Sequence, residues 1–267
     1  MTSPRPEQPA PAYVPAHDLL RDKVVVVTAA AGAGIGAAVA RRVLEEGARA
    51  VVLGDTHARR LAEAQELLAQ EFGAERVRSL GCDVTVEAQV RALVDAADDL
   101  GGVEVMVNNA GLGGTASVVE MTDDQWAKVI DITLTGTFRC VRAASRSMIA
   151  AGRRGVIVNN ASVVGWRAQE GQAHYAAAKA GVMALTRCAA TDLAPYGIRV
   201  NAVSPSLAMH PFLAKVTSEE LLAELKQREA FGRAAEPWEV ANVMVFLASD
   251  YSSYLTGEVV SVSSQHA

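Results

Sequence analysis

Cysteine, aromatic residues and long apolar runs are all scarce in this chain of 267 residues. Its three cysteines, Cys82, Cys140 and Cys188, are odd in number and far apart, which excludes a disulfide framework and predicts reduced thiols in the core. The five histidines have no paired ligand spacing, so no metal site is expected. No apolar run approaches the roughly 18 residues of a membrane helix. The N-terminus also lacks the basic and apolar regions of a signal peptide. We therefore expect a cytoplasmic protein with no membrane partner.

A basic surface is missing as well. The formal net charge is −5. Because binding to phosphate backbones needs a basic face, this balance argues against nucleic acid as the partner. Half of the residues are apolar, which is enough for one large core in a single domain.

Five of the nine prolines lie within residues 1–20. Such a segment is typical of a flexible or extended arm, so the folded domain is expected to span residues 21–267.

From residue 23 onward, short apolar runs rich in β-branched residues alternate with longer segments of helical periodicity. This pattern predicts an α/β fold with a doubly wound, parallel, seven-stranded sheet of the Rossmann type. The expected strands are Lys23–Thr28, Ala50–Leu53, Val77–Cys82, Val103–Asn108, Gly155–Asn160, Ile198–Ser204 and Glu258–Ser263. The expected helices are Ile35–Glu46, Ala58–Glu71, Glu87–Leu100, Asp123–Ala151, Ala173–Ala194 and Pro237–Ala248.

The segment 205–231 interrupts this alternation between the sixth strand and the last helix. A long insertion at the carboxyl end of a strand is typical of a lid over an active site.

A glycine-rich turn, with Gly32, Gly34 and Gly36, follows the first strand and opens a helix at Ile35. Glycines let backbone N–H groups approach a pyrophosphate, and the helix N-terminus favours negative charge. On its own such a turn also fits a plain strand-to-helix connection, but its place after the first strand favours a dinucleotide cofactor.

Asp55 follows the second strand, nineteen residues after Gly36. A carboxylate there can accept hydrogen bonds from the ribose hydroxyls of NAD and would repel the 2′-phosphate of NADP. Asp55 also fits the N-cap of the next helix, and the nearby Arg59 and Arg60 leave NADP open.

Tyr175 and Lys179 are four residues apart on a predicted helix and therefore share a face. A phenol with a pKa of about 10 is a poor base at neutral pH, and a neighbouring ammonium is expected to lower that pKa. Ser162, just after the fifth strand, can hold a substrate oxygen. Together these three residues predict hydride transfer at an alcohol or carbonyl carbon, with Tyr175 as the acid/base.

These motifs, in this order, resemble the short-chain dehydrogenase/reductase family from about residue 20 to residue 263. The resemblance rests on Thr28, Gly32–Gly36, Asp83, Asn108–Gly111, Ser162 and Tyr175-Ala-Ala-Ala-Lys179. It implies an NAD(P)-dependent oxidoreductase with Ser162, Tyr175 and Lys179 as catalytic residues. It also implies a set of cofactor-binding residues, namely Gly32, Gly34, Ile35, Gly36, Asp55, Asp83, Val84, Asn109, Ala110, Gly111, Tyr175, Lys179, Pro205 and Leu207.

The chain departs from the family pattern at four places. Ala29 replaces the first glycine of a turn that is one residue longer, and Thr133 replaces the asparagine that holds a relay water in the family. The residues after Pro205 and the ending Ser263-Ser264-Gln265 also differ from the usual motifs. We expect the relay to survive through the Thr133 hydroxyl or backbone.

Several of these segments resemble one subgroup of the family, which oxidises a ring hydroxyl on the CoA thioester of a C/D-ring propanoate in bacterial sterol degradation. That resemblance implies a small-molecule substrate, a substrate pocket with Trp166, Arg167 and His210, and a homotetramer. Core packing for Trp166, a solvated charge for Arg167 and an ordinary lid histidine for His210 stay open as alternatives. So do two other functions, a 3-oxoacyl-thioester reductase that uses NADPH and a non-catalytic NAD-binding protein.

Overall fold

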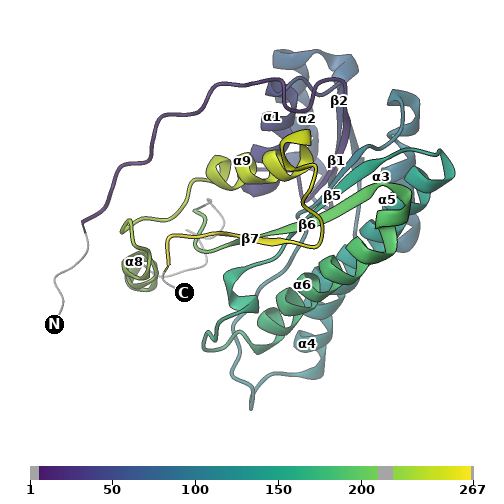
Figure 1. Ribbon diagram of the computed structural model, residues 1–267. Coiled ribbons are helices and arrows are strands. Elements are labelled where there is room, and N and C mark those ends of the chain that lie inside the picture. Colours follow the sequence, from purple (N-terminus) through teal and green to yellow (C-terminus); the bar gives the residue numbers. More distant parts are fainter. Residues whose placement is uncertain (1–5, 210–218, 266–267) are drawn as a thin grey trace.

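A computed structural model describes residues 6–209 and 219–265 of the chain. Its centre is a seven-stranded, all-parallel sheet with the strand order β3-β2-β1-β4-β5-β6-β7 (Figure 1). The strands are β1 (Val24–Thr28), β2 (Ala50–Asp55), β3 (Val77–Gly81), β4 (Val105–Asn108), β5 (Gly155–Asn160), β6 (Ile198–Pro205) and β7 (Val259–Val262). The predicted doubly wound sheet is confirmed. The order reverses between β1 and β4, where the carboxyl ends of such strands leave a crevice for ligands.

Helices cover both faces of the sheet (Figure 1). The helices are α1 (Ile35–Glu45), α2 (Ala58–Phe72), α3 (Glu87–Asp95), α4 (Asp123–Ile130), α5 (Gly136–Ala150), α6 (Ala173–Leu193), α8 (Glu219–Arg228) and α9 (Pro237–Ala248). One core lies under α1, α2 and α9, and the other under α3, α5 and α6. Strand β1 contributes side chains to both cores. Val25 and Val27 belong to the first core, and Val24 and Val26 belong to the second. Each buried valine contributes about 1.5–3 kcal/mol, so the continuous apolar runs stabilise both faces at once.

The predicted helix Asp123–Ala151 is wrong as one element, because a π-helical turn, η3 (Asp131–Thr135), divides it into α4 and α5. Helical periodicity does not register a single widened turn. Such turns are frequent at functional sites, and this one holds Thr133. The helix predicted to end at Leu100 ends at Asp95, and a short 3₁₀ turn follows at Asp98–Leu100.

The predicted lid contains helix α8, which the sequence analysis did not identify. Pro205 is the last residue of β6 rather than the first of the lid. Residues 210–218 of the lid, His210 among them, lie outside the part of the chain that the structure describes.

The described part of the N-terminal arm, residues 6–20, has no helix or strand and lies against the body. The Gln8 N–H donates to the Phe231 carbonyl at 2.9 Å, and the Tyr13 ring packs edge-on against Trp238 at 5.3 Å. Further along, the Glu46 carboxylate accepts hydrogen bonds from the backbone N–H groups of His17 and Leu19. These contacts join the arm to α1, to α9 and to the segment between α8 and α9.

Two of the cysteines lie in the core as predicted, but Cys188 is exposed. Burial raises the pKa of Cys82 to about 11, so its thiol is inert at neutral pH. Among the described residues, no cluster of His, Cys, Asp or Glu side chains has the geometry to hold a metal ion. None of the described helices is long and apolar enough to cross a membrane.

Candidate active site

The glycine-rich turn joins the carboxyl end of β1 to the N-terminus of α1. An added Cβ at Gly36 would lie 2.2 Å from the Ala29 carbonyl oxygen and 2.6 Å from Asn109 Nδ2, so only glycine fits there. An added Cβ at Gly32 or Gly34 would meet nothing within 4 Å. The turn is therefore packed tightly against the body at Gly36 and open on its outer side at the other two glycines.

Asn109 and Thr28 fasten this turn to the end of β4. The Thr28 hydroxyl accepts hydrogen bonds from the backbone N–H groups of Asn109 and Ala110, both at 3.0 Å. The Asn109 side chain donates to the carbonyls of Thr28 and Ala29, and its oxygen accepts from Asn160 Nδ2 at 2.9 Å. The carboxyl ends of β1, β4 and β5 are thus joined at the crevice.

The N-terminus of α1 fits the pyrophosphate of a dinucleotide. Gly34 is the N-cap and supplies no side-chain hydrogen bond, and the first turn holds no acidic residue. The first N–H groups of a helix lack intrahelical partners, and together with the helix dipole they favour an anion. The open faces at Gly32 and Gly34 border a cavity of about 240 Å³ between α1 and α2.

Asp55 is the last residue of β2 and its carboxylate faces the glycine-rich turn. It accepts hydrogen bonds from the N–H groups of Ala31 at 3.1 Å and His57 at 2.9 Å. The N-cap of α2 is His57, so the alternative role of Asp55 as that cap is wrong. Arg59 forms an ion pair with Glu63 at 3.1 Å, and both Arg59 and Arg60 are exposed. A negative charge therefore stands beside the turn where an adenosine ribose is expected.

The remaining residues predicted for the cofactor line the neighbouring strand ends. The Asp83 carboxylate accepts hydrogen bonds from the N–H and the hydroxyl of Thr85. Val84 is buried against Gly136, where an added Cβ would lie 2.6 Å from Val84 Cγ2. An added Cβ at Gly111 would lie 3.4 Å from Lys179 Nζ, so this glycine leaves room beside the lysine. Ile35 opens α1 and packs on the first core.

Ser162, Tyr175 and Lys179 come together at the carboxyl end of β5. The Ser162 hydroxyl hydrogen-bonds with the Tyr175 phenol, and Lys179 Nζ lies 5.5 Å from the centre of the Tyr175 ring. Lys179 is buried, and its ammonium donates to the Asn160 carbonyl at 2.5 Å. The spacing of four residues on α6 does place both side chains on the same face, as the sequence predicted.

The pKa values here differ from the expectation that Lys179 lowers the pKa of the phenol. Burial raises the pKa of Tyr175 to about 12, although the Ser162 hydrogen bond lowers it in part. Burial also lowers the pKa of Lys179 to about 8. Desolvation is therefore the largest influence on the pKa of both groups.

Asn160 was not among the predicted site residues, although it connects two of them. Its carbonyl accepts from Lys179, and its side chain donates to Asn109. The signal in the sequence was the polar pair Asn159-Asn160 at the end of an otherwise apolar strand. Asn159 belongs to the core instead, where it joins Asn108 to Thr186.

Thr133 lies on the π-helical turn and is fully buried. Its hydroxyl accepts from the Leu112 N–H at 2.9 Å and donates to the Leu112 carbonyl at 3.1 Å. The proton and one of the two lone pairs of the hydroxyl are thus used by one backbone unit. The expected relay through the Thr133 hydroxyl or backbone stays a prediction.

The residues predicted for the substrate pocket differ in burial and in hydrogen bonding. Trp166 is 49% exposed, so core packing does not explain it. Arg167 is partly buried, and its Nη1 donates to Gln265 Oε1 at 2.6 Å, which excludes a purely solvated charge. The Leu207 N–H donates to Glu229 at 3.3 Å, beside Pro205 at the end of β6. His210 lies outside the described residues.

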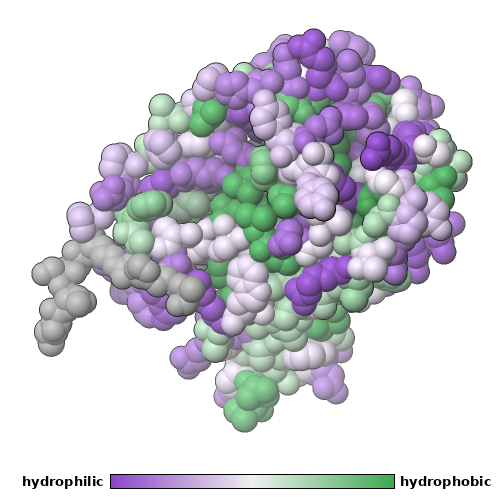
Figure 2. All heavy atoms as spheres, in the orientation of Figure 1, coloured by the Kyte–Doolittle hydropathy of each residue, from purple (hydrophilic) through white to green (hydrophobic). Residues whose placement is uncertain are grey.

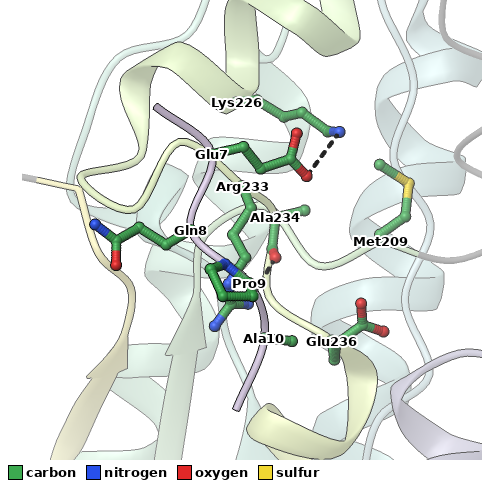
Figure 3. A pocket seen from close by; sticks show the side chains of 9 residues that line it. All are labelled: Glu7, Gln8, Pro9, Ala10, Met209, Lys226, Arg233, Ala234 and Glu236. Carbon is green, nitrogen blue, oxygen red and sulfur yellow. Dashed lines mark hydrogen bonds and ion pairs between the residues drawn. The ribbon is translucent and has the colours of Figure 1, made fainter. Parts of the chain in front are cut away.

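A cavity of about 330 Å³ lies apart from these residues, between the N-terminal arm, α8 and the segment before α9 (Figure 3). Glu7 and Lys226 reach toward each other across it and form an ion pair at 3.6 Å. Neither Ser162 nor Tyr175 nor Lys179 lines this cavity. It is therefore separate from the predicted site of hydride transfer.

Comparison with known proteins bears on the family. The model of a family described as enoyl-(acyl carrier protein) reductase matches residues 29–264. This chain belongs to the short-chain dehydrogenase/reductase family. As a member of the short-chain dehydrogenase/reductase family it is an oxidoreductase that binds NAD(P), which excludes the non-catalytic alternative.

One curated relative within the short-chain dehydrogenase/reductase family is 62% identical over 96% of this chain and 98% of its own length. It is the (5R,7aS)-5-hydroxy-7a-methyl-1-oxo-2,3,5,6,7,7a-hexahydro-1H-indene-carboxyl-CoA reductase of Mycobacterium tuberculosis. A solved short-chain dehydrogenase from Mycobacterium smegmatis is 54% identical, with a TM-score of 0.86 over 97% of this chain and 99% of that one. NAD⁺-bound xylitol dehydrogenase is 35% identical, with a TM-score of 0.84 over 92% and 99% of the two chains.

Proposed function

We propose that this enzyme oxidises a ring secondary alcohol to a ketone on a CoA-thioester intermediate of sterol ring degradation, with NAD as the hydride acceptor. The observation that carries this proposal is the 62% identity, over almost the whole chain, to a relative named for a hydroxy-methyl-oxo-indene carboxyl-CoA. That name puts the thioester carboxyl on the bicyclic ring, whereas the sequence resemblance implied a propanoate. The proposed substrate therefore carries its CoA thioester on the ring carboxyl.

The three catalytic residues have different roles in the proposed reaction. When bound, NAD supplies a carbon that accepts the hydride. The Ser162 hydroxyl holds the substrate oxygen, and the Tyr175 phenolate takes the proton from it. The Lys179 ammonium, held by the Asn160 carbonyl, stabilises the phenolate through its positive charge.

The choice of NAD over NADP rests on Asp55. Its carboxylate stands at the carboxyl end of β2 next to the turn, where a 2′-phosphate would be repelled.

Initial rates with three substrates test the proposed function. These are the hydroxy-methyl-oxo-hexahydroindene carboxyl-CoA, its free acid and a short straight-chain 3-hydroxyacyl-CoA, each with NAD and NADP and in both directions. We expect the bicyclic CoA thioester with NAD to give the highest kcat/KM. Because remote binding energy can raise the rate at the reacting carbon, loss of CoA should lower kcat as well as affinity.

The second candidate is a 3-oxoacyl-thioester reductase that uses NADPH. The observation that favours it is a second relative, the 3-oxoacyl-[acyl-carrier-protein] reductase of Aquifex aeolicus, which is 35% identical over 91% of this chain and 97% of its own length. A higher kcat/KM for the straight-chain thioester with NADP(H) would support this function against the first.

We also propose that the enzyme works in the cytoplasm as a homo-oligomer, a tetramer by analogy with the family. In Figure 2, apolar side chains gather over α9 and β7. Phe246 of α9 is 38% exposed, and Val260 of β7, which packs against the same core as α9, is only partly buried. A subunit interface would bury this apolar surface. Light scattering on the purified protein, compared with Phe246→Glu, would measure the number of subunits.

A further inference from the structure

The end of the chain folds back against the segment that follows α8 (Figure 1). The Ser263 hydroxyl accepts a hydrogen bond from the Gln265 N–H at 3.0 Å, which turns the chain just after β7. The Ala230 N–H then donates to the Ser264 carbonyl at 2.9 Å. The residues where this chain departs from the family's usual ending are thus fixed beside Glu229.

Glu229 is 1% exposed, so its carboxylate depends on donors within the protein. It accepts hydrogen bonds from the Ser264 hydroxyl at 2.8 Å and from Gln265 Nε2 at 2.9 Å. The Leu207 N–H donates to the same carboxylate at 3.3 Å. One buried group therefore joins residues 264 and 265 to the exit of β6, where Pro205 and Leu207 are predicted to bind the cofactor.

Gln265 extends this network toward Ser162. Its Nε2 donates to Glu229, and its Oε1 accepts from Arg167 Nη1 at 2.6 Å. An amide can donate on one side and accept on the other, which neither a carboxylate nor an ammonium can do. The orientation of the amide follows from its partners, an acid on one side and a cation on the other.

Arg167 lies five residues after Ser162, and its N–H is bonded to the Val163 carbonyl at 3.0 Å. The partner of its guanidinium in this network is a neutral amide oxygen rather than a carboxylate. Its positive charge is therefore directed but not neutralised by Gln265. A guanidinium has five N–H donors in a fixed plane, which suits the oxygens of a phosphate.

We propose that Gln265 is a positioning residue that orients Arg167, and that Arg167 binds a phosphate group of the CoA part of the substrate. This inference rests on the proposed function, because CoA is the source of the phosphate. Glu229 anchors Gln265 and, through Leu207, links this phosphate contact to the cofactor side of the site.

A pair of thioesters isolates the phosphate contact. The bicyclic hydroxy acid is presented as its CoA thioester and as its pantetheine thioester, which lacks every phosphate. We expect Arg167→Ala to lower kcat/KM about 10- to 100-fold for the CoA thioester, the range for a charge-assisted hydrogen bond, and less than about 2-fold for the pantetheine thioester. Gln265→Ala should show part of the same selective loss. The double variant should be no worse than Arg167→Ala, because Gln265 acts through the arginine.

Ser264→Ala is the matched control, since Ser264 bonds to Glu229 but not to Arg167. It should leave the ratio of the two kcat/KM values unchanged. The affinity for NADH should also be unchanged in Gln265→Ala, because Glu229 keeps its bonds to Leu207 and Ser264. If Gln265→Ala lowered the kcat/KM of both thioesters equally, or weakened NADH binding to the same extent, its role would be structural only and the proposal would be overturned.

Calorimetric titration of free CoA into the NADH-loaded enzyme separates this inference from the proposed function. If the wild type turned over neither bicyclic thioester, the proposed function would fail. CoA binding that is weakened by Arg167→Ala and Gln265→Ala, but not by Ser264→Ala, would still support the phosphate contact. Equal CoA affinity in all four proteins would refute it.

Discussion

The Thr133 hydroxyl and the backbone of Leu112 form a closed pair, in which the hydroxyl accepts from the Leu112 N–H and donates to the Leu112 carbonyl. Thr133 sits on the widened turn between α4 and α5, and Leu112 lies in the loop that follows β4. The pair therefore holds this loop against the helix beside Lys179. The residue that replaces the family's relay asparagine thus supports the backbone of this loop.

We expect Thr133→Val to lower the free energy of unfolding by about 1–3 kcal/mol, because both Leu112 backbone groups would lose a partner in a buried place. Thr133→Ser keeps the hydroxyl and should stay within about 1 kcal/mol of the wild type in urea unfolding. If Thr133→Val unfolded at the same urea concentration as the wild type, the hydrogen bonds between Thr133 and Leu112 would not contribute to the stability of the fold. Turnover of Thr133→Ser close to that of the wild type would fit a supporting role.

Tyr175→Phe removes the phenol and keeps the ring. We expect turnover to fall at least about 100-fold, the lower range for a general acid–base group, with cofactor affinity retained. Steady-state rates and titration of NADH fluorescence measure the two effects. A variant that turned over at close to the wild-type rate would exclude Tyr175 as the acid/base.

Lys179→Met should stabilise the protein while abolishing turnover. Burial holds the pKa of Lys179 at about 8, below the 10.5 of the unfolded chain, so the folded state disfavours the ammonium. The cost at pH 7 is about 1–3 kcal/mol, and it persists at every pH below 8. Between pH 8 and 10.5 the folded protein releases this proton first, so the wild type becomes more stable relative to the variant. Urea unfolding should show that the difference in stability between Lys179→Met and the wild type is smaller at pH 10 than at pH 7. An equal difference at both pH values would contradict burial of the ammonium as the cause.

Asp55 governs the choice of cofactor through its charge. We expect the wild type to have a higher kcat/KM with NAD than with NADP, and Asp55→Asn to narrow that gap. The asparagine retains an oxygen for the Ala31 N–H but lacks the negative charge that repels a 2′-phosphate. Measuring kcat/KM with both cofactors tests this, and a wild-type preference for NADP would move the assignment to Arg60 and the reductase function.

Ala29 has a left-handed backbone, with φ at 50°, at the position where the family has glycine. This conformation costs an alanine about 1–2 kcal/mol, while glycine loses about 0.5–1 kcal/mol more entropy on folding. Ala29→Gly should therefore stabilise the protein by up to about 1 kcal/mol, measured as a rise in the urea midpoint. A clear loss of stability would mean that the alanine methyl group makes a compensating contact.

Sequence periodicity was sufficient for the sheet and most helices, because the central strands are buried on both faces and α1 to α5 each carry one apolar stripe. The same local logic placed Tyr175 and Lys179 on one face of α6, since four residues complete about one helical turn. It missed the widened turn at Asp131–Thr135, which changes the path of the backbone without changing the apolar pattern.

The amino-acid sequence by itself determined the order of strands and helices, the glycine-rich turn and the pair on α6, because these depend on neighbours within a few residues. Only the tertiary structure decided which groups satisfy Lys179, Thr133 and Arg167. Their partners, Asn160, Leu112 and Gln265, lie 19, 21 and 98 residues away along the chain. Burial decided the pKa values of Tyr175 and Lys179 in the same way, since desolvation depends on every segment packed around a group and on no local pattern.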